Sequence, residues 1–337
     1  MMLTRTILPN SSRVFARYAT TIASNPHTPQ IKNKSAGGLG ISTKVYTNDE
    51  VAQHDDNKFI SHAMFPHPKW TDEDCALVQV EHREPQTLSD RFAYSAIQFV
   101  RKSFDFVTGY KKSDNLDDTF KGTRYEMTEA KWLTRVIFLE SIAGVPGMCA
   151  GFIRHLHSLR LLKRDKAWIE TLLDEAYNER MHLLTFIKLG QPSWFTRSII
   201  YVAQGIFTNV FFLAYLVRPK VCHRLVGYLE EEAVATYTHL LHQLKKGELK
   251  QFDHVQVPKI ATQYWSELNE NSTFYDLVAR IRADEAKHRE VNHTLANLSQ
   301  KSDRNPFALQ VTPGKPEPNN GLKVTRGTGW EKDEMTL

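Results

Sequence analysis

The chain has 337 residues, with 43 Lys and Arg against 38 Asp and Glu, and a formal net charge of +5. This length accommodates one large domain with its own core. The first 48 residues hold six basic residues and no acidic residue, so the remainder of the chain is close to neutral. A near-neutral charge outside the first 48 residues argues against nucleic-acid binding, which requires a strongly positive surface.

Two N-terminal regions precede the predicted helices. Residues 1–48 are rich in Ser and Thr, contain arginines and lack acids, which is typical of a mitochondrial transit peptide; a disordered basic tail is the alternative. Residues 49–84 are polar and rich in His, Pro and Asp, and we expect an extended arm there. No CxxC spacing occurs, so neither a disulfide framework nor a zinc ribbon is indicated for the three cysteines, Cys75, Cys149 and Cys222.

Residues 85–300 form a helical domain in this interpretation, and the fold class is all-α. An N-cap at Ser89–Asp90 predicts the start of the first helix, and Gly190 with Pro192 ends the third. We find no convincing strand. The tail at residues 301–337 is rich in Pro and Gly, and we expect it to be loose. The six predicted helices cover approximately residues 90–107, 128–157, 165–189, 195–217, 219–247 and 275–298.

Four of these helices carry acidic residues on faces that should be apolar. Two of them hold the pattern Glu-x-x-His, and because residues three apart share a helical face, both side chains can reach one metal ion. Two Glu and two Glu-x-x-His motifs are the ligand set of dimetal-carboxylate bundles, and carboxylates with imidazoles suit iron or manganese. The residues concerned are Glu140, Glu179 with His182, the run Glu230–Glu232, and Glu285 with His288.

A lone Glu-x-x-His motif is usually a solvated pair, so the combination carries this prediction. Four buried, unpaired carboxylates would cost several kcal/mol each or become neutral, and a pair of cations removes that cost. Within the run of three glutamates, Glu230 shares its helical stripe with Val226, Val234 and Tyr237. This is the most apolar of the three faces, so Glu230 is favoured as the ligand over its two neighbours.

Four segments together resemble the signature motifs of the alternative oxidase family, and the resemblance extends over residues 85–300. Ser141 stands where Thr is common in the family, and Lys287 where a second His is common; the Lys variant is similar to fungal members. Neither residue is a predicted ligand. The segments are Leu139-Glu-Ser141, Asn178-Glu-Arg-Met-His-Leu183, Leu229-Glu-Glu-Glu-Ala233 and Arg282-Ala-Asp-Glu-Ala-Lys-His-Arg289.

The resemblance implies a ubiquinol oxidase that reduces O2 to water without pumping protons, with two iron ions as cofactors. It implies a ferritin-like four-helix bundle with two additional membrane-associated helices, in a homodimer. Tyr237 matches a tyrosine beside the diiron centre that supplies an electron and a proton, and a core tyrosine is the alternative. By motif position the metal ligands are Glu140, Glu179, His182, Glu230, Glu285 and His288.

The family also has a quinol pocket, and six residues match positions that line it. Among them, Arg135 could hydrogen-bond a quinol oxygen, and a structural ion pair is the alternative. Two rival functions remain open at this point. One is a diiron hydroxylase acting on a quinone precursor, and the other is a non-catalytic membrane-surface scaffold, which would need no iron. The six pocket residues are Arg101, Arg135, Leu139, Glu232, Ala233 and Thr236.

An uncharged segment raises the question of membrane topology. Residues 198–217 are long enough to span about 30 Å of hydrocarbon. However, predicted ligands lie on both sides of the segment, and a single span would place Glu179 and Glu230 on opposite faces of the bilayer. We therefore expect a monotopic protein on the matrix side of the mitochondrial inner membrane. Interleaved basic and Leu residues at 154–164 fit a helix lying on an anionic surface.

Overall fold

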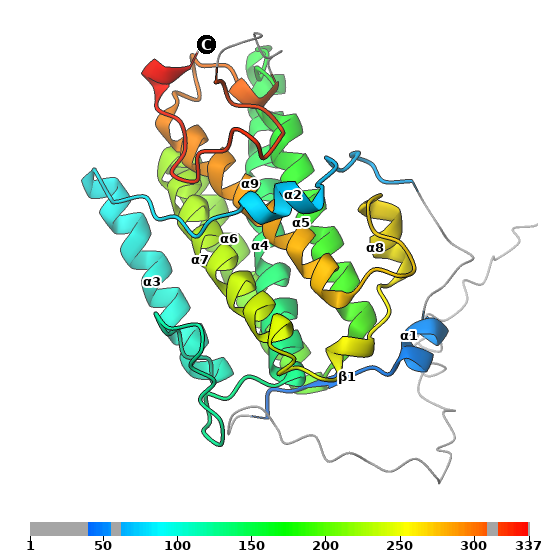
Figure 1. Ribbon diagram of the computed structural model, residues 1–337. Coiled ribbons are helices and arrows are strands. Elements are labelled where there is room, and N and C mark those ends of the chain that lie inside the picture. Colours follow the sequence, from blue (N-terminus) through cyan, green and yellow to red (C-terminus); the bar gives the residue numbers. More distant parts are fainter. Residues whose placement is uncertain (1–39, 55–61, 309–315, 336–337) are drawn as a thin grey trace, which may run out of the picture. The chain divides into compact units, whose positions relative to one another are not determined.

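The computed structural model describes residues 40–54, 62–308 and 316–335. The chain divides into two units, residues 1–34 and 35–337, and only the second contains described residues. The expected transit peptide therefore lies almost entirely outside the described residues. The predicted all-α class is confirmed (Figure 1), and the six predicted helices are α3 Leu88–Thr108, α4 Glu129–Leu161, α5 Trp168–Leu189, α6 Trp194–Val217, α7 Pro219–Lys245 and α9 Phe274–Asn297.

Helices α4, α5, α7 and α9 form a bundle in which α4 packs along α5 and α7 packs along α9. The two pairs meet where α4 contacts α7 and α5 contacts α9. Close approach within each pair depends on glycine. A Cβ at Gly147 would lie 2.4 Å from the carbonyl oxygen of Leu172 on α5, and one at Gly227 would lie 2.5 Å from the ring of His293 on α9. Side chains larger than hydrogen would force the paired helices apart.

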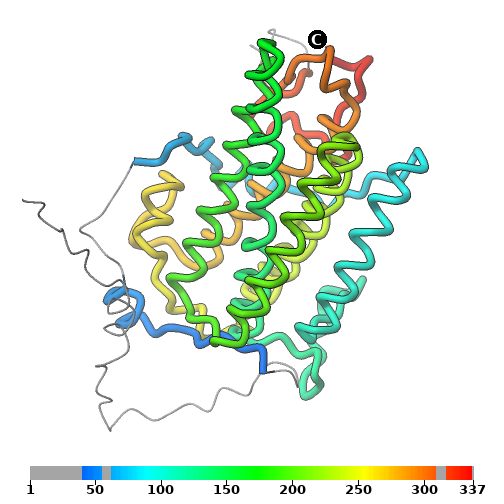
Figure 2. The backbone as a smooth tube through the Cα atoms, turned by 180° about the vertical axis from the view of Figure 1, so that it is seen from behind, coloured from blue at the N-terminus to red at the C-terminus, as the bar shows by residue number. Residues whose placement is uncertain are grey.

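Helices α3 and α6 lie outside this bundle. Helix α3 packs on α7 and α4, and α6 packs on α4 and α7, running beside the bundle (Figure 2). Both leave large apolar side chains exposed, namely Phe92, Phe99 and Phe106 on α3 and Tyr201, Ile206 and Leu213 on α6. Among the described residues, α4 and α6 are long and apolar enough to cross a membrane, and of the two only α4 is mostly buried within the protein.

Several short elements were not predicted from sequence. They lie before and within the arm, between the long helices and near the C-terminus, and three to seven residues are too few for a periodic pattern. The expectation of no strand is wrong, because two three-residue strands pair antiparallel, with Thr43 opposite Pro192. These elements are β1 Thr43–Val45, α1 Asn48–His54, α2 Asp72–Leu77, β2 Gly190–Pro192, α8 Lys259–Tyr264 and the 3-10 helices Phe252–His254, Pro306–Ala308 and Lys332–Glu334.

The cap of α3 also differs from the prediction. Thr87 is the N-cap: its hydroxyl accepts the backbone N–H of Asp90, and the Asp90 carboxylate accepts the backbone N–H of Thr87. This is a capping box, in which the acidic side chain occupies the third helical position. The sequence places Ser89 and Asp90 so close to Thr87 that composition alone does not identify which residue caps the helix.

The C-terminal segment is ordered against α9, so the expected loose tail is wrong for residues 316–335. Trp330 is 1 % exposed, and its indole N–H donates to Glu290 at 2.6 Å. Its backbone N–H donates to the Thr294 hydroxyl at 3.0 Å, and Glu290 also accepts the backbone N–H of Arg326. Composition suggested disorder because Pro and Gly are frequent, but one buried tryptophan and a buried carboxylate on α9 anchor the segment.

Candidate metal centre

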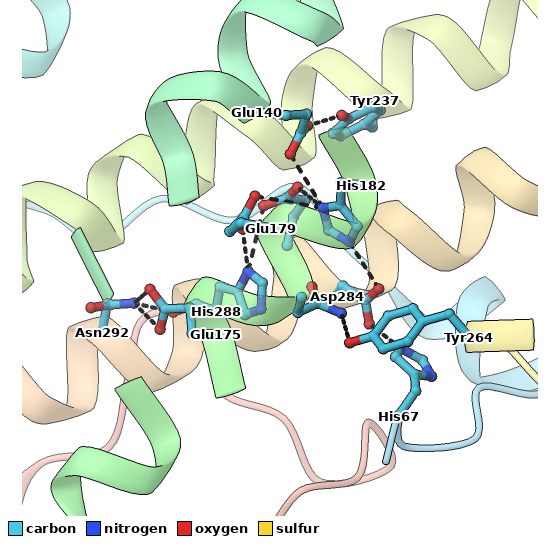
Figure 3. Close-up of polar contacts among 12 residues, drawn as sticks. His67, Glu140, Glu175, Glu179, His182, Tyr237, Tyr264, Asp284, His288 and Asn292 are labelled. Atoms are coloured by element: carbon cyan, nitrogen blue, oxygen red, sulfur yellow. Dashed lines mark hydrogen bonds and ion pairs between the residues drawn. The ribbon is translucent and has the colours of Figure 1, made fainter. Parts of the chain in front are cut away.

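The bundle brings all six predicted metal-binding side chains together. Figure 3 shows four of them, Glu140, Glu179, His182 and His288. None of the six is more than 7 % exposed, and Glu179 and His182 are wholly buried. Their ligand atoms form two groups that share two glutamates, and within each group these atoms lie within 4.8 Å of one another. The groups are Glu140, Glu179, His182 and Glu285, and Glu179, Glu230, Glu285 and His288.

Helical spacing and helix pairing both contribute to this geometry. Within α5, Nδ1 of His182 lies 3.5 Å from Oε2 of Glu179, and within α9, Nδ1 of His288 lies 3.8 Å from Oε2 of Glu285. Contacts between the two helices are shorter. Nδ1 of His288 lies 2.7 Å from Oε1 of Glu179, and Nδ1 of His182 lies 3.3 Å from Oε1 of Glu285. The i, i+3 pairs therefore face each other across the bundle axis.

The electrostatics of the cluster call for cations. Burial, followed by repulsion from Glu179 and Glu285, raises the pKa of Glu140 well above its ordinary value. Burial and the same two neighbours also raise the pKa of Glu230. One oxygen of Glu230 and one of Glu285 are buried without a hydrogen-bond partner. Unpartnered buried carboxylate oxygens are strongly unfavourable, so this donor set fits metal ions, which would occupy the lone pairs and offset the repulsion.

The three consecutive glutamates of α7 point to different surroundings. Glu230 joins the cluster, as its face predicted. Glu231 accepts hydrogen bonds from the backbone N–H of Arg83 at 2.9 Å and from Nε2 of His293 at 2.8 Å, away from the cluster. Glu232 forms an ion pair with Arg101 and accepts from Gln98 at 2.8 Å. Successive residues on a helix are rotated by about 100°, so only one of three can face the bundle axis.

An acidic residue to which the sequence analysis gave no role orients one imidazole. Asp284, 3 % exposed, lies 3.1 Å from Nε2 of His182 and accepts indole N–H groups from Trp70 at 2.5 Å and Trp265 at 3.0 Å. Nε2 of His67 lies 2.7 Å from Oδ1 of Asp284. Proton donation from Nε2 leaves the Nδ1 lone pair of His182 free for a metal ion. In the sequence, the only indication of this role was that Asp284 immediately precedes the predicted ligand Glu285.

Tyr237 lies at the same cluster, where it is fully buried and its hydroxyl donates to Oε1 of Glu140. Burial, followed by the charge of Glu140, raises its pKa well above the ordinary value. The phenol therefore keeps its proton while it contacts a cluster carboxylate. A buried tyrosine hydroxyl usually finds a hydrogen-bond partner, so this contact fits both a core tyrosine and a tyrosine that acts at the cluster.

A second feature is an apolar cavity of about 100 Å³ between α3, α4 and α7. It reaches Glu140, Glu230 and Tyr237 at its inner end, and its other lining is mainly Ile, Leu, Val, Phe and Ala. All six residues predicted to line a quinol pocket border it: Arg101, Arg135, Leu139, Glu232, Ala233 and Thr236. Arg135 also forms an ion pair with Asp105 at 2.7 Å. The two interpretations of Arg135 therefore coexist, since it borders the cavity while holding a carboxylate.

A four-helix bundle that buries four glutamates and two histidines in this arrangement has the set of side chains with which helical dimetal-carboxylate proteins bind their metal ions. The chain belongs to the alternative oxidase family: the family model described as Alternative oxidase matches residues 70–297. It is 63 % identical over 334 residues to "Alternative oxidase, mitochondrial" of Scheffersomyces stipitis, covering 97 % of this chain and 93 % of that protein. It is 59 % identical to the protein of the same name from Wickerhamomyces anomalus, covering 99 % and 98 %.

The chain is also 56 % identical to "Alternative oxidase 2, mitochondrial" of Candida albicans, over 98 % of this chain and 96 % of the relative. The sequence-based assignment to the family, with a likeness to fungal members, is confirmed by these matches. The protein is accordingly an oxidoreductase of this family, and its buried Glu and His groups could hold metal.

Proposed function

We propose that the protein oxidises ubiquinol and reduces O2 to water at two iron ions, without pumping protons, in the mitochondrial inner membrane. The observation that carries this proposal is the juxtaposition of two sites. An apolar cavity whose lining suits a quinol borders a buried cluster of four carboxylates and two imidazoles. Relatives named as mitochondrial alternative oxidases support it.

In this proposal the six clustered residues hold the irons, with Glu179 and Glu285 common to both groups. Bound iron would supply the electron transfer to O2. The remaining residues bind and orient the quinol. The apolar walls exclude water from the head group, and Arg101 and Arg135 each have a guanidinium nitrogen that lacks a partner in the described structure. Such a donor suits a quinol oxygen. The hydroxyl of Tyr237 holds a proton in direct contact with Glu140 of the cluster.

The exposed apolar faces of the helices support the proposed way in which the protein binds the membrane. Val100, which lines the apolar cavity, is itself 54 % exposed on α3, so the cavity borders the outward face of that helix. An apolar face lying in one leaflet would let quinol enter from the lipid. Helix α6 packs along α4 and α7, which carry cluster residues. A spanning α6 would thus pull the buried cluster into the bilayer, and a monotopic protein on the matrix side avoids that cost.

The proposed basic surface strip needs one change. Arg154 is buried, pairs with Asp165 at 2.7 Å and stacks over Trp168, so it does not face a membrane. The other basic residues of the strip, His155, His157, Arg160, Lys163 and Arg164, are exposed. The remaining parts of the proposal rest on composition and resemblance alone: residues 1–48 as an import sequence and a homodimeric assembly.

The test is quinol-dependent oxygen uptake by the purified protein in the presence of cyanide, with iron quantified in the same sample. We expect about two irons per chain and uptake that is lost on chelation and restored by iron but not by zinc, which has no redox chemistry. A protein that oxidises quinol without iron, or binds iron without quinol-dependent uptake, would contradict the proposal. Iron binding without quinol-dependent uptake would favour the hydroxylase, and a protein with neither iron nor uptake would favour the scaffold.

Topology is tested separately, with cysteines introduced at Gln191 and Lys220, which flank α6 and are both exposed. The native cysteines, Cys75, Cys149 and Cys222, are free and buried, so they give little background. In mitoplasts, both introduced cysteines should resist an impermeant thiol reagent and react once the matrix side is opened. Labelling of either site in intact mitoplasts would refute the monotopic arrangement.

A further inference from the structure

A second cavity, of about 460 Å³, meets the cluster from a different side. It lies between α5 and α9, and the arm around His67 and Phe307 also line it. Polar groups make up a larger share of its lining than of the first cavity's lining, and the lining includes Lys287 and, from the cluster, His288. Four carboxylates border it: Glu170, Asp174, Glu175 and Asp284. The cluster is therefore bordered by two cavities, of which the second has the more polar lining.

Three of these carboxylates follow α5 from solvent towards the cluster. Glu170 is exposed, Asp174 is half-buried and Glu175 is 5 % exposed. Glu179, one turn beyond Glu175, belongs to both groups of clustered residues. Residues four apart lie on the same helical face, so Glu170 shares a face with Asp174, and Glu175 shares a face with Glu179. The series therefore turns around α5 as it leads from solvent to the cluster. A graded series of acids that ends at a buried reaction centre is an arrangement that can conduct protons.

The carboxylate of Glu175 is held by a neutral side-chain amide. Both of its oxygens accept from the side-chain amide of Asn292, at 2.8 and 3.0 Å, and that amide also contacts the carbonyl oxygen of His288 (Figure 3). Among the described residues, no ion pair with Glu175 forms. Burial is the largest cause that raises its pKa, to about 7, and burial also raises the pKa of Asp174. Both protonation states of Glu175 are therefore accessible near neutral pH.

The geometry points to this cavity as the aqueous route of the reaction, in which protons reach the centre along Glu170, Asp174 and Glu175, and product water leaves. The inference rests on the proposed function. Two quinols release four electrons and four protons, and one O2 takes up four of each to become two waters. Protons that enter here therefore replace those that quinol releases on the apolar side, and no further reactant is needed.

The first test compares Glu175→Gln, Glu175→Asp and Asp174→Asn with Glu270→Gln, an exposed control outside the cavity. Glu175→Gln should keep its iron and its KM for quinol, because quinol binds in the other cavity. Its kcat should fall by about tenfold or more, and its solvent deuterium isotope effect should rise. Glu175→Asp should recover part of the rate, and Asp174→Asn should show a smaller change in the same direction. Wild-type kcat and isotope effect in Glu175→Gln would overturn the inference.

A second measurement needs neither iron nor quinol. Thr171 lines the cavity and is half-buried, so a Thr171→Cys variant reports on access to it. Methanethiosulfonate reagents of opposite charge should label it at different rates, the cationic one about tenfold faster, because the lining is acidic. Adding Glu175→Gln and Asp174→Asn should reduce that preference. Absent labelling, or equal rates for both charges, would refute an acidic aqueous route even if Glu175→Gln had lost its iron.

The two proposals fail in different ways. If the wild-type protein does not consume oxygen with quinol, the proposed function fails, whatever the labelling shows. If the wild-type protein is active and labelling shows no acidic access, only the route fails. Labelled Thr171→Cys should also turn over more slowly than the unlabelled variant, because the added group fills the route. An unchanged rate after complete labelling would count against water leaving there.

Discussion

Oδ2 of Asp284 lies 3.1 Å from Nε2 of His182, on the edge of the ring opposite the clustered carboxylates. This contact fixes both the ring orientation and the tautomer that leaves Nδ1 free. Asp284→Asn should lower iron affinity by about 10- to 100-fold, the usual cost of losing such a partner. Iron content measured against a graded chelator series checks this, with exposed Asp253→Asn as control. Equal affinities would mean that Asp284 acts only in packing.

The glutamate run of α7 gives a comparison between neighbours. Glu230→Ala should abolish iron binding and activity, because a buried cluster oxygen donor is lost. Glu231→Ala should keep the iron but lower the free energy of unfolding by about 1–3 kcal/mol, since His293 and the Arg83 amide lose a buried acceptor. Iron quantification and thermal unfolding distinguish the two variants. Iron loss in Glu231→Ala with retention in Glu230→Ala would reverse the assignment.

Tyr237→Phe removes one hydroxyl and little volume. The variant should bind iron as the wild type does, because Tyr237 is not among the six clustered side chains. Its quinol oxidase turnover should fall by about 100-fold if the hydroxyl that contacts Glu140 passes on a proton and an electron. Turnover and iron content measured together provide the check. Unchanged turnover would return Tyr237 to the role of a core residue.

Arg135 has two roles that paired variants can separate. Arg135→Ala should keep iron and raise the KM for quinol by about tenfold, equivalent to about 1.4 kcal/mol of binding energy. Asp105→Asn removes the ion pair with Arg135 while leaving the guanidinium at the cavity. Steady-state kinetics with varied quinol should show the large KM change in the first variant alone. Equal effects in both would mean that Arg135 acts through the ion pair.

Stability should fall on acidification because buried histidines resist protonation. Burial lowers the pKa of His223 to about 4, where its ring contacts the Tyr215 hydroxyl and Asn292. Burial likewise lowers the pKa of His293 to about 4. The unfolded chain takes up these protons below its pKa of about 6.5, whereas the folded protein does not. Each histidine therefore makes its full contribution to the free energy of unfolding above a pH of about 6.5. That contribution declines as the pH falls towards 4, by about 2 kcal/mol per histidine between pH 7 and 5.

Thermal unfolding of the wild type and of His223→Gln, at pH 7 and pH 5, measures that contribution. The variant should be less stable at pH 7 and should lose less on acidification than the wild type. Both proteins share the six clustered side chains, so acid release of any bound metal would affect them alike and cancel in the comparison. An identical loss in both would mean that His223 is not held neutral by the fold.

The sequence by itself determined the helices and the six clustered side chains. Residues such as Gly190 and Pro192 marked where predicted helices end, and the i, i+3 spacing of Glu and His placed both side chains on one face. The apolar stripe of α7 selected Glu230, and the structure turns Glu231 and Glu232 away from the cluster. These features are local, because a helix repeats every 3.6 residues whatever surrounds it.

Only the tertiary structure decided which distant groups meet. Asp284 contacts Trp70, 214 residues away in sequence, and Glu175 meets Asn292 across 117 residues. No periodicity encodes such pairings, because they depend on how helices pack. The ordered C-terminal segment follows the same rule: its composition resembles a loose tail, yet Trp330 finds a buried acceptor on α9. Which side chains are buried, and which partners they contact, are properties of the packed bundle, and local sequence patterns do not reveal them.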